Sequence, residues 1–147
     1  MADFPGSVLF ACTHNAIRSP MAEGVLKHLL GDRVYVDSVG VHAGEIDAFA
    51  VAVMDEIGID INRHHSKAFD ELEDTYFDLV ISLSPEAQHR AVEMTRTMAT
   101  EVEYWKTMDP SYVHGNREVR IKVYREVRDE LLNRIKLRFQ AMVAPEV

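Results

Sequence analysis

The chain alternates short strand-like runs with amphipathic stretches, and this alternation restricts the possible folds more than any other feature. The short runs predict strands at Ser7–Ala11, Arg33–Asp37, Phe77–Leu83 and Glu101–Tyr104. Apolar residues at helical spacing predict helices over Ser19–Leu30, Asp47–Ile57, Pro85–Met94 and Arg117–Met142. Strands that alternate with helices pair in parallel through right-handed crossovers. We therefore expect one α/β domain over residues 1–147, with a four-stranded parallel sheet flanked by helices on both faces.

The charge balance and the single cysteine limit the partners of this chain. With 16 basic and 24 acidic residues, its formal net charge of −8 opposes binding to nucleic acid or to an anionic membrane, so we expect neither as a partner. The apolar run before Cys12 is too short for a signal-peptide core or a membrane span, which predicts a cytoplasmic protein. One cysteine and seven histidines without metal-ligand spacing predict no metal and no cofactor.

The loop after the first predicted strand carries the most specific chemistry. It reads C-T-H-N-A-I-R-S, a C-x5-R-S pattern between a strand and the start of a helix. The backbone N–H groups of such a loop and the positive end of the following helix can together bind a dianion such as phosphate, sulfate or arsenate. We therefore predict a phosphate-binding loop formed by Thr13, His14, Asn15, Ala16, Ile17, Arg18 and Ser19.

Four residues of this segment have predicted roles. Cysteine attacks as its thiolate, and a helix N-terminus and a guanidinium stabilise that form, which makes Cys12 the predicted nucleophile. The planar fork of Arg18 matches two phosphoryl oxygens, and Ser19 can donate a hydrogen bond to the thiolate. Asn15 tolerates the left-handed backbone that a tight loop needs. The alternative interpretation is that Cys12 is a small buried hydrophobic residue.

Several segments resemble the low-molecular-weight protein tyrosine phosphatase family. The run V-L-F-A-C-T-H-N-A-I-R-S-P-M-A-E resembles its phosphate-binding loop, and Ser38-Val39-Gly40 resembles its turn after the second strand. Met108-Asp109-Pro110 resembles the loop that carries the family's acid. The resemblance runs nearly end to end and implies a two-step hydrolysis of phosphotyrosine-like substrates without a metal. Cys12 would form a phosphocysteine, and Asp109 would protonate the leaving oxygen and then activate water.

The resemblance also implies residues that support the loop. Ser38, and His64 with Ser66, would brace it through hydrogen bonds, and Tyr112 would line the substrate cleft. The implied partners are a phosphorylated protein or small-molecule substrate, and phosphate or another oxyanion.

Departures from the family pattern leave two other functions open. Ile17 stands where many members have a second cysteine, and the stretch at the end of the third predicted strand reads Ser82-Leu83-Ser84-Pro85, without a cysteine. Thioredoxin-coupled arsenate reductases share the fold and need extra cysteines in that stretch. The alternatives are an arsenate-reductase-like protein that uses an external thiol, and a non-catalytic sensor of phosphate or another oxyanion.

Overall fold

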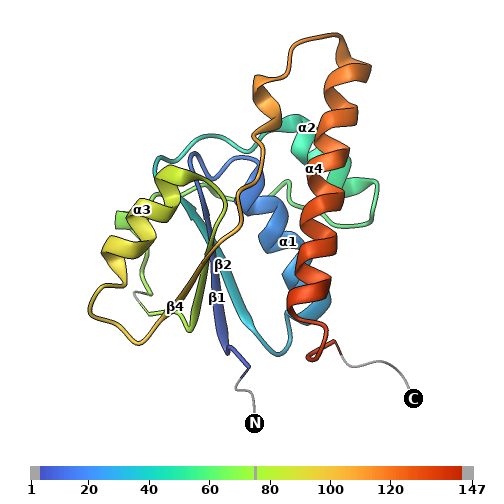
Figure 1. The fold of residues 1–147 in the computed structure, drawn as a ribbon. Coiled ribbons are helices and arrows are strands. Elements are labelled where there is room, and N and C mark those ends of the chain that lie inside the picture. Colours follow the sequence, from blue (N-terminus) through green and yellow to red (C-terminus); the bar gives the residue numbers. More distant parts are fainter. Residues whose placement is uncertain (1–3, 75, 144–147) are drawn as a thin grey trace.

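The strand that leads to Cys12 lies inside the sheet of the computed structural model (Figure 1), which describes residues 4–74 and 76–143. The strands are β1 (Ser7–Cys12), β2 (Tyr35–Gly40), β3 (Leu79–Ser82) and β4 (Glu101–Tyr104). They are parallel and lie in the order β2-β1-β3-β4. Since ligands of open parallel sheets bind beyond the carboxyl ends of the strands, Cys12 is at the edge where a site is expected.

Helices cover both faces of this sheet. They are α1 (Arg18–Leu30), α2 (Ala48–Asp55), α3 (Pro85–Met94) and α4 (Arg117–Arg138). Figure 1 shows α1, α2 and α4 on one side and α3 on the other, in agreement with the contacts between these elements. Two single-turn 3-10 helices lie in the connections, η1 (Phe69–Glu71) and η2 (Pro110–Tyr112). The predicted α/β fold with a four-stranded parallel sheet and helices on both faces is confirmed.

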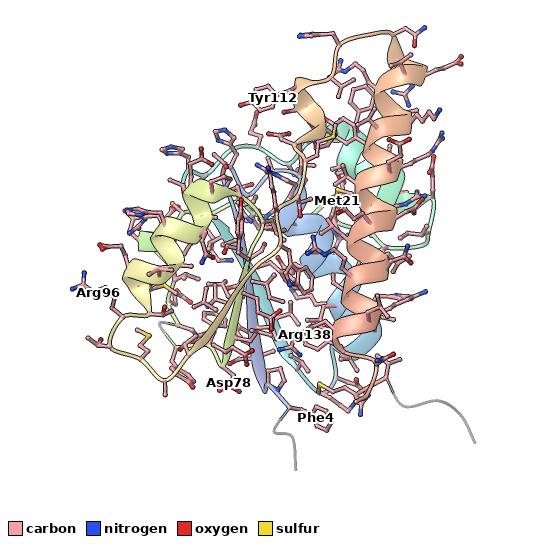
Figure 2. The ribbon with its side chains drawn as sticks, viewed as in Figure 1. Phe4, Met21, Asp78, Arg96, Tyr112 and Arg138 are labelled. Carbon is pink, nitrogen blue, oxygen red and sulfur yellow. The ribbon has the colours of Figure 1, made fainter. Side chains whose placement is uncertain are left out.

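The side chains of β1 are buried on both faces of the sheet. Val8 and Phe10 belong to the core under α1 and α4, whereas Leu9 and Ala11 belong to a smaller core under α3. Met21 of α1 is fully buried in the larger core (Figure 2). Burial on both faces explains why this strand is a continuous apolar run instead of an alternating one.

The second strand differs most from the prediction, because it covers Tyr35–Gly40 instead of Arg33–Asp37. It begins later since the N–H groups of Arg33 and Val34 bond to the Leu30 carbonyl at the end of α1. It continues further because it pairs with β1 as far as Cys12, which lies opposite Gly40. The extension brings the last residues of β2 next to the predicted phosphate-binding loop.

Other element boundaries differ by a few residues. Helix α1 begins at Arg18, one residue earlier than predicted. Asp47 precedes α2 as its N-cap, and the helix ends at Asp55, before the positive-φ turn at Gly58. The last helix ends at Arg138, four residues before the predicted Met142, because the chain then closes into turns on Phe139.

Residues 4–74 and 76–143 contain neither a membrane-spanning helix nor a cluster of metal-binding side chains. No helix there combines the length and the apolar character needed to cross a bilayer. No three His, Cys, Asp or Glu side chains there gather closely enough to hold a metal ion.

Candidate active site

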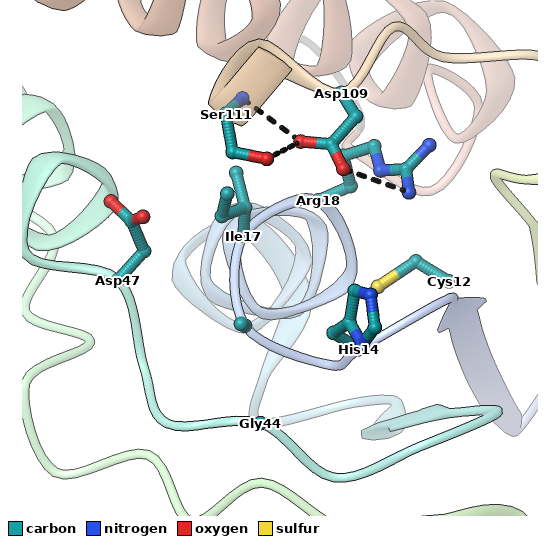
Figure 3. A pocket seen from close by; sticks show the side chains of 9 residues that line it. Cys12, His14, Ile17, Arg18, Gly44, Asp47, Asp109 and Ser111 are labelled. Atoms are coloured by element: carbon teal, nitrogen blue, oxygen red, sulfur yellow. Dashed lines mark hydrogen bonds and ion pairs between the residues drawn. The ribbon is translucent and has the colours of Figure 1, made fainter.

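A cavity opens at the carboxyl end of β1, beside Cys12 (Figure 3). Its volume is ≈ 240 Å³. It is lined by Cys12, His14, Ala16, Ile17, Arg18, Gly44, Asp47, Asp109 and Ser111. These residues come from the segment between the end of β1 and the first residue of α1, from the loop before α2 and from the segment around η2. The volume is smaller than that of a drug-sized ligand site and suits an oxyanion with part of an attached group.

The Cys12 thiol is held among hydrogen-bond donors. The N–H of Asn15 donates to Cys12 Sγ at 3.3 Å, and Ser19 Oγ lies 2.9 Å from the sulfur. The hydroxyl of Ser19 also accepts a hydrogen bond from the Asn15 side chain, and its single proton has two acceptors within reach, the Cys12 sulfur at 2.9 Å and the Val39 carbonyl oxygen at 3.3 Å. Hydrogen bonds of this kind stabilise negative charge on the sulfur.

Asn15 fixes the shape of the loop. It is fully buried and has a φ of 53°, in the left-handed region. Its Nδ2 donates to Ser19 Oγ at 2.8 Å and to Ser38 Oγ at 3.0 Å. Its Oδ1 accepts from the N–H of Lys67 at 2.9 Å and lies 3.0 Å from His64 Nε2. The structure thus brings together Asn15, Ser19, Ser38 and His64.

Behind this cluster lies Glu23, a buried carboxylate that the sequence did not single out. The hydroxyl of Ser38 donates to Glu23 Oε1, and Lys27 Nζ pairs with the other oxygen. His64 Nδ1 lies 3.7 Å from Glu23 Oε1. Burial lowers the pKa of His64 below its ordinary value, while the Glu23 carboxylate acts in the opposite direction. The loop therefore rests on a buried polar network that includes a negative charge.

Arg18 lies along the wall of the cavity, and only 7% of its surface is exposed. Its Nη1 donates to the carbonyl of Thr107 at 2.9 Å, and its Nη2 donates to Thr13 Oγ1 at 3.4 Å. Its Nη2 also lies 3.7 Å from Asp109 Oδ2. Because a guanidinium has five N–H donors, these contacts orient Arg18 and leave donors for a bound oxyanion.

Asp109 faces Arg18 from the segment that begins η2 (Figure 3). Its Oδ1 accepts two hydrogen bonds from Ser111, one from the N–H at 2.9 Å and one from the hydroxyl at 2.7 Å. Its Oδ2 is directed toward Arg18. Since Oδ1 is occupied, Oδ2 is the oxygen that remains available for proton transfer.

Besides the cluster of Asn15, Ser19, Ser38 and His64, two other predicted site residues, Thr13 and Tyr112, do not line the cavity. Thr13 donates through Oγ1 to Ser84 Oγ at 3.0 Å. Tyr112 projects from η2 and is 76% exposed (Figure 2). His14 lines the cavity, and its ring stacks on His42 with a centroid separation of 5.8 Å.

The structure adds contributors that the sequence did not indicate. Gly44, Asp47 and Ser111 line the cavity. Ser66, in contrast, is a brace that the family resemblance implied, and its hydroxyl donates to the carbonyl of Asn15 at 2.7 Å. An aspartate before an apolar run is a helix N-cap signal, but that signal says nothing about a cavity. Thr107 contributes only its backbone carbonyl, a group that every residue has and that no sequence pattern distinguishes.

The chain is similar to phosphatases and to arsenate reductases. A family model described as low molecular weight phosphotyrosine protein phosphatase matches residues 7–144. The arsenate reductase of Bacillus subtilis is 37% identical over 129 residues, 88% of this chain and 91% of that protein. The arsenate reductase of Halalkalibacterium halodurans is 39% identical over 130 residues, with the same coverage of 88% and 91%.

Solved structures agree with this assignment. An arsenate reductase in the phosphate-binding state is 29% identical, with a TM-score of 0.77 and coverage of 94% of this chain and 98% of that one. The low molecular weight protein tyrosine phosphatase of T. tengcongensis is also 29% identical, with a TM-score of 0.76 and coverage of 92% and 98%. With its family model matched over nearly its whole length, the chain belongs to the low molecular weight phosphotyrosine protein phosphatase family.

Proposed function

We propose that this chain is a cysteine-dependent phosphomonoester hydrolase, with Cys12 as the nucleophile and Asp109 as the general acid and base. The observation that carries the proposal is that Cys12, Arg18 and Asp109 line one cavity. Phosphoryl transfer depends on positioning and on neutralising charge, so a nucleophile, an anion clamp and a proton donor around one small space are the groups it requires.

In the first step the Cys12 thiolate attacks phosphorus. The S–P bond forms while the P–O bond to the leaving group breaks. The backbone N–H groups of the loop, the positive end of α1 and the Arg18 guanidinium hold the remaining phosphoryl oxygens. Protonated Asp109 gives the proton on Oδ2 to the departing oxygen.

In the second step a water molecule attacks the phosphocysteine. Asp109, now a carboxylate, takes a proton from this water, and the S–P bond breaks to release phosphate and the Cys12 thiolate. The hydroxyl of Ser19, 2.9 Å from the sulfur, stabilises the departing thiolate. Substrates would be phosphorylated proteins or small phosphomonoesters, in a reducing compartment such as the cytoplasm that keeps the thiol free.

The names of the curated relatives favour a second candidate, an arsenate reductase that uses an external thiol. Arsenate has the geometry of phosphate and would occupy the same loop. Its reduction to arsenite takes two electrons, which two thiols supply when they form a disulfide. Cys12 is the only cysteine of the chain, so the second thiol would come from a glutathione- or thioredoxin-type donor.

Turnover assays separate these functions. We expect the purified protein to hydrolyse p-nitrophenyl phosphate, and Cys12→Ser to abolish this turnover while vanadate binding survives. If the wild-type protein hydrolyses no phosphomonoester but forms arsenite with glutathione or thioredoxin, the second candidate replaces the first. If it only binds phosphate, without either reaction, the protein is an oxyanion sensor and the hydrolase proposal is wrong.

A further inference from the structure

A second carboxylate, Asp47, lies across the cavity from Cys12 (Figure 3). Its N–H donates to the carbonyl of Ala16 at 3.0 Å, which fixes it beside the phosphate-binding loop. Its Oδ1 accepts from the N–H groups of Phe49 at 2.8 Å and Ala50 at 3.1 Å. These contacts make Asp47 the N-cap of α2, a role that an uncharged Ser or Asn fills equally well. Capping alone therefore does not require a charged residue at this position.

The other oxygen of Asp47 accepts a hydrogen bond from the hydroxyl of Tyr124 at 3.0 Å. Burial, together with the charge of Asp47, raises the pKa of Tyr124 above its ordinary value. The phenol therefore keeps its proton and donates it to Asp47 without supplying a compensating charge. A carboxylate has about four acceptor positions, so one remains after Phe49, Ala50 and Tyr124 have bound.

No lysine or arginine pairs with Asp47 within 4.0 Å in the described part of the chain. Arg18 is directed to Thr107 and Asp109. Arg117 and Arg120 of α4 stack on the Phe49 ring, 5.4 and 4.7 Å from its centroid. The negative charge of Asp47 thus lines the cavity without an ion-pair partner of its own.

The rest of the cavity offers little to a flat aromatic leaving group. Phe, Tyr and Trp are absent from its lining, and His14 supplies the one ring there. Tyr112, the aromatic residue near the acid, is exposed and does not line the cavity. A partly shielded carboxylate favours cationic N–H donors, because charge-assisted hydrogen bonds are stronger than neutral ones.

We propose that Asp47 selects substrates whose leaving group carries a cationic nitrogen, an ammonium or a guanidinium. This nitrogen would pair with the Asp47 carboxylate while the phosphoryl group occupies the Cys12 loop. The inference rests on the proposed hydrolase function and leaves its steps unchanged, since Cys12 still attacks phosphorus and Asp109 still protonates the leaving oxygen. The role of Asp47 is limited to selecting the leaving group.

The test compares two substrates that differ in one charge, 4-(aminomethyl)phenyl phosphate and 4-(hydroxymethyl)phenyl phosphate. We expect the wild-type protein to favour the amine, and Asp47→Asn to lower the amine-to-hydroxyl ratio of kcat/KM by about tenfold. Because both substrates are compared on both proteins, their intrinsic reactivities cancel. Asn caps a helix as well as Asp does, and Asp47→Ser provides a second uncharged cap if the Asn variant folds poorly.

Asp32→Asn is the matched control. Asp32 is exposed in the turn between α1 and β2, at the end of the sheet away from the cavity, so this change alters the net charge equally and should leave the ratio at its wild-type value. A ratio that is unchanged in both Asp47 variants would overturn the proposal. An equal fall in the Asp32 variant would also overturn it, because the effect would then be one of net charge.

Binding to the Cys12→Ser protein separates this inference from the hydrolase proposal. Calorimetry should show tighter binding of the amine than of the alcohol, and the difference should vanish when Asp47→Asn is added. Equal affinities before that addition would refute the role of Asp47. If Cys12→Ser binds the amine more tightly but the wild-type protein hydrolyses neither compound, the proposed role of Asp47 stands and the proposed hydrolase function is wrong. Phosphotyrosine peptides with Lys or Gln beside the phosphotyrosine then show whether the cation belongs to a protein or to a small substrate.

Discussion

At the scale of single residues, the site depends most heavily on Asn15. Replacing it with Ala removes its contacts to Ser19, Ser38, His64 and the Lys67 N–H, and leaves a left-handed backbone on a residue that disfavours it. We expect Asn15→Ala to lower the free energy of unfolding by about 3 kcal/mol and to weaken vanadate binding. Denaturant unfolding measures the first effect and titration the second. Asn15→Gly loses the same amide contacts but tolerates the left-handed backbone, so it isolates the effect of the contacts. Wild-type behaviour of that variant would show that the amide contacts are dispensable.

Arg18 is a second residue for which a conservative change should be costly. Lys keeps the charge but loses the planar fork that holds Thr107 and a bound oxyanion at once. We expect Arg18→Lys to reduce kcat/KM for p-nitrophenyl phosphate by about a hundredfold. Kinetics like those of the wild-type protein would remove Arg18 from the catalytic machinery.

The roles of Asp109 and Ser111 can be tested with a series of aryl phosphates. A general acid matters most when the leaving oxygen is basic, so Asp109→Asn should slow poor leaving groups far more than good ones. Ser111→Ala removes the hydroxyl that holds Asp109 Oδ1 and should produce the same trend more weakly. The slope of log kcat/KM against leaving-group pKa is the measurement. Equal slowing across the series would make Asp109 a structural turn residue.

At the scale of elements, the contact between the end of β2 and the phosphate-binding loop leaves no room for a side chain. A Cβ on Gly40 would lie 2.5 Å from the His42 carbonyl oxygen and 2.6 Å from the Asn15 nitrogen. Backbone atoms cannot rotate away, so we expect Gly40→Ala to displace the loop and to weaken oxyanion binding. Gly6→Ala is the control, because the Cβ there would meet only a flexible Asp78 side chain. Unimpaired vanadate binding by Gly40→Ala would contradict this packing.

The stability contributed by the contact between α2 and α4 should depend on pH. The hydrogen bond from Arg125, with Arg128 in support, lowers the pKa of Glu56 to about 2. Because this pKa is lower than in the unfolded chain, the pair contributes stability at neutral pH and loses it as the pH falls from about 4.5 toward 2. Glu56 is largely solvated, so we expect Glu56→Gln to cost at most about 1 kcal/mol at pH 7 and less at pH 3. If the difference in unfolding free energy between the wild-type protein and Glu56→Gln stays constant from pH 7 to pH 3, the ion pair is not its cause.

At the scale of the whole molecule, the fold could be predicted because its signals are local. The apolar run of β1, the helix start after Arg18 and the spacing within α4 each lie within one segment. The end of β2 could not be predicted, since Gly40 resembles a strand breaker and is held by long-range partners, Cys12 of β1 and the Lys67 carbonyl that accepts from its N–H.

The site could be predicted only in part, for a related reason. The residues from Cys12 to Ser19 are contiguous, and their spacing indicates an anion loop. The groups that hold this loop arrive from distant segments, and two of them, the Lys67 N–H and the Thr107 carbonyl, are backbone groups. The sequence around Asp47 indicates one role, the N-cap of α2, and contains no pattern that places Asp47 in the cavity.

The single cysteine also determines how the whole chain responds to oxidants. Peroxide converts an accessible thiolate through sulfenic to sulfinic acid unless a neighbouring thiol traps it as a disulfide. No second cysteine exists in this sequence, so we expect prolonged peroxide treatment to inactivate the protein irreversibly and thiol reductants to rescue only early damage. Mass spectrometry of Cys12, with and without saturating phosphate, measures this. Full recovery in dithiothreitol after long exposure, without sulfinic or sulfonic acid, would point to a protective form of the thiol.

The position of this sulfur on the cavity wall has a practical consequence. A thiol-directed alkylating reagent can label the chain at one atom only, and that atom lies where a substrate would bind. The labelling rate therefore reports how open the cavity is, and a compound that occupies the cavity slows the rate in proportion to its occupancy. The unmodified protein thus carries its own reporter for screening collections of small phosphates, and the screen needs neither turnover nor an engineered tag.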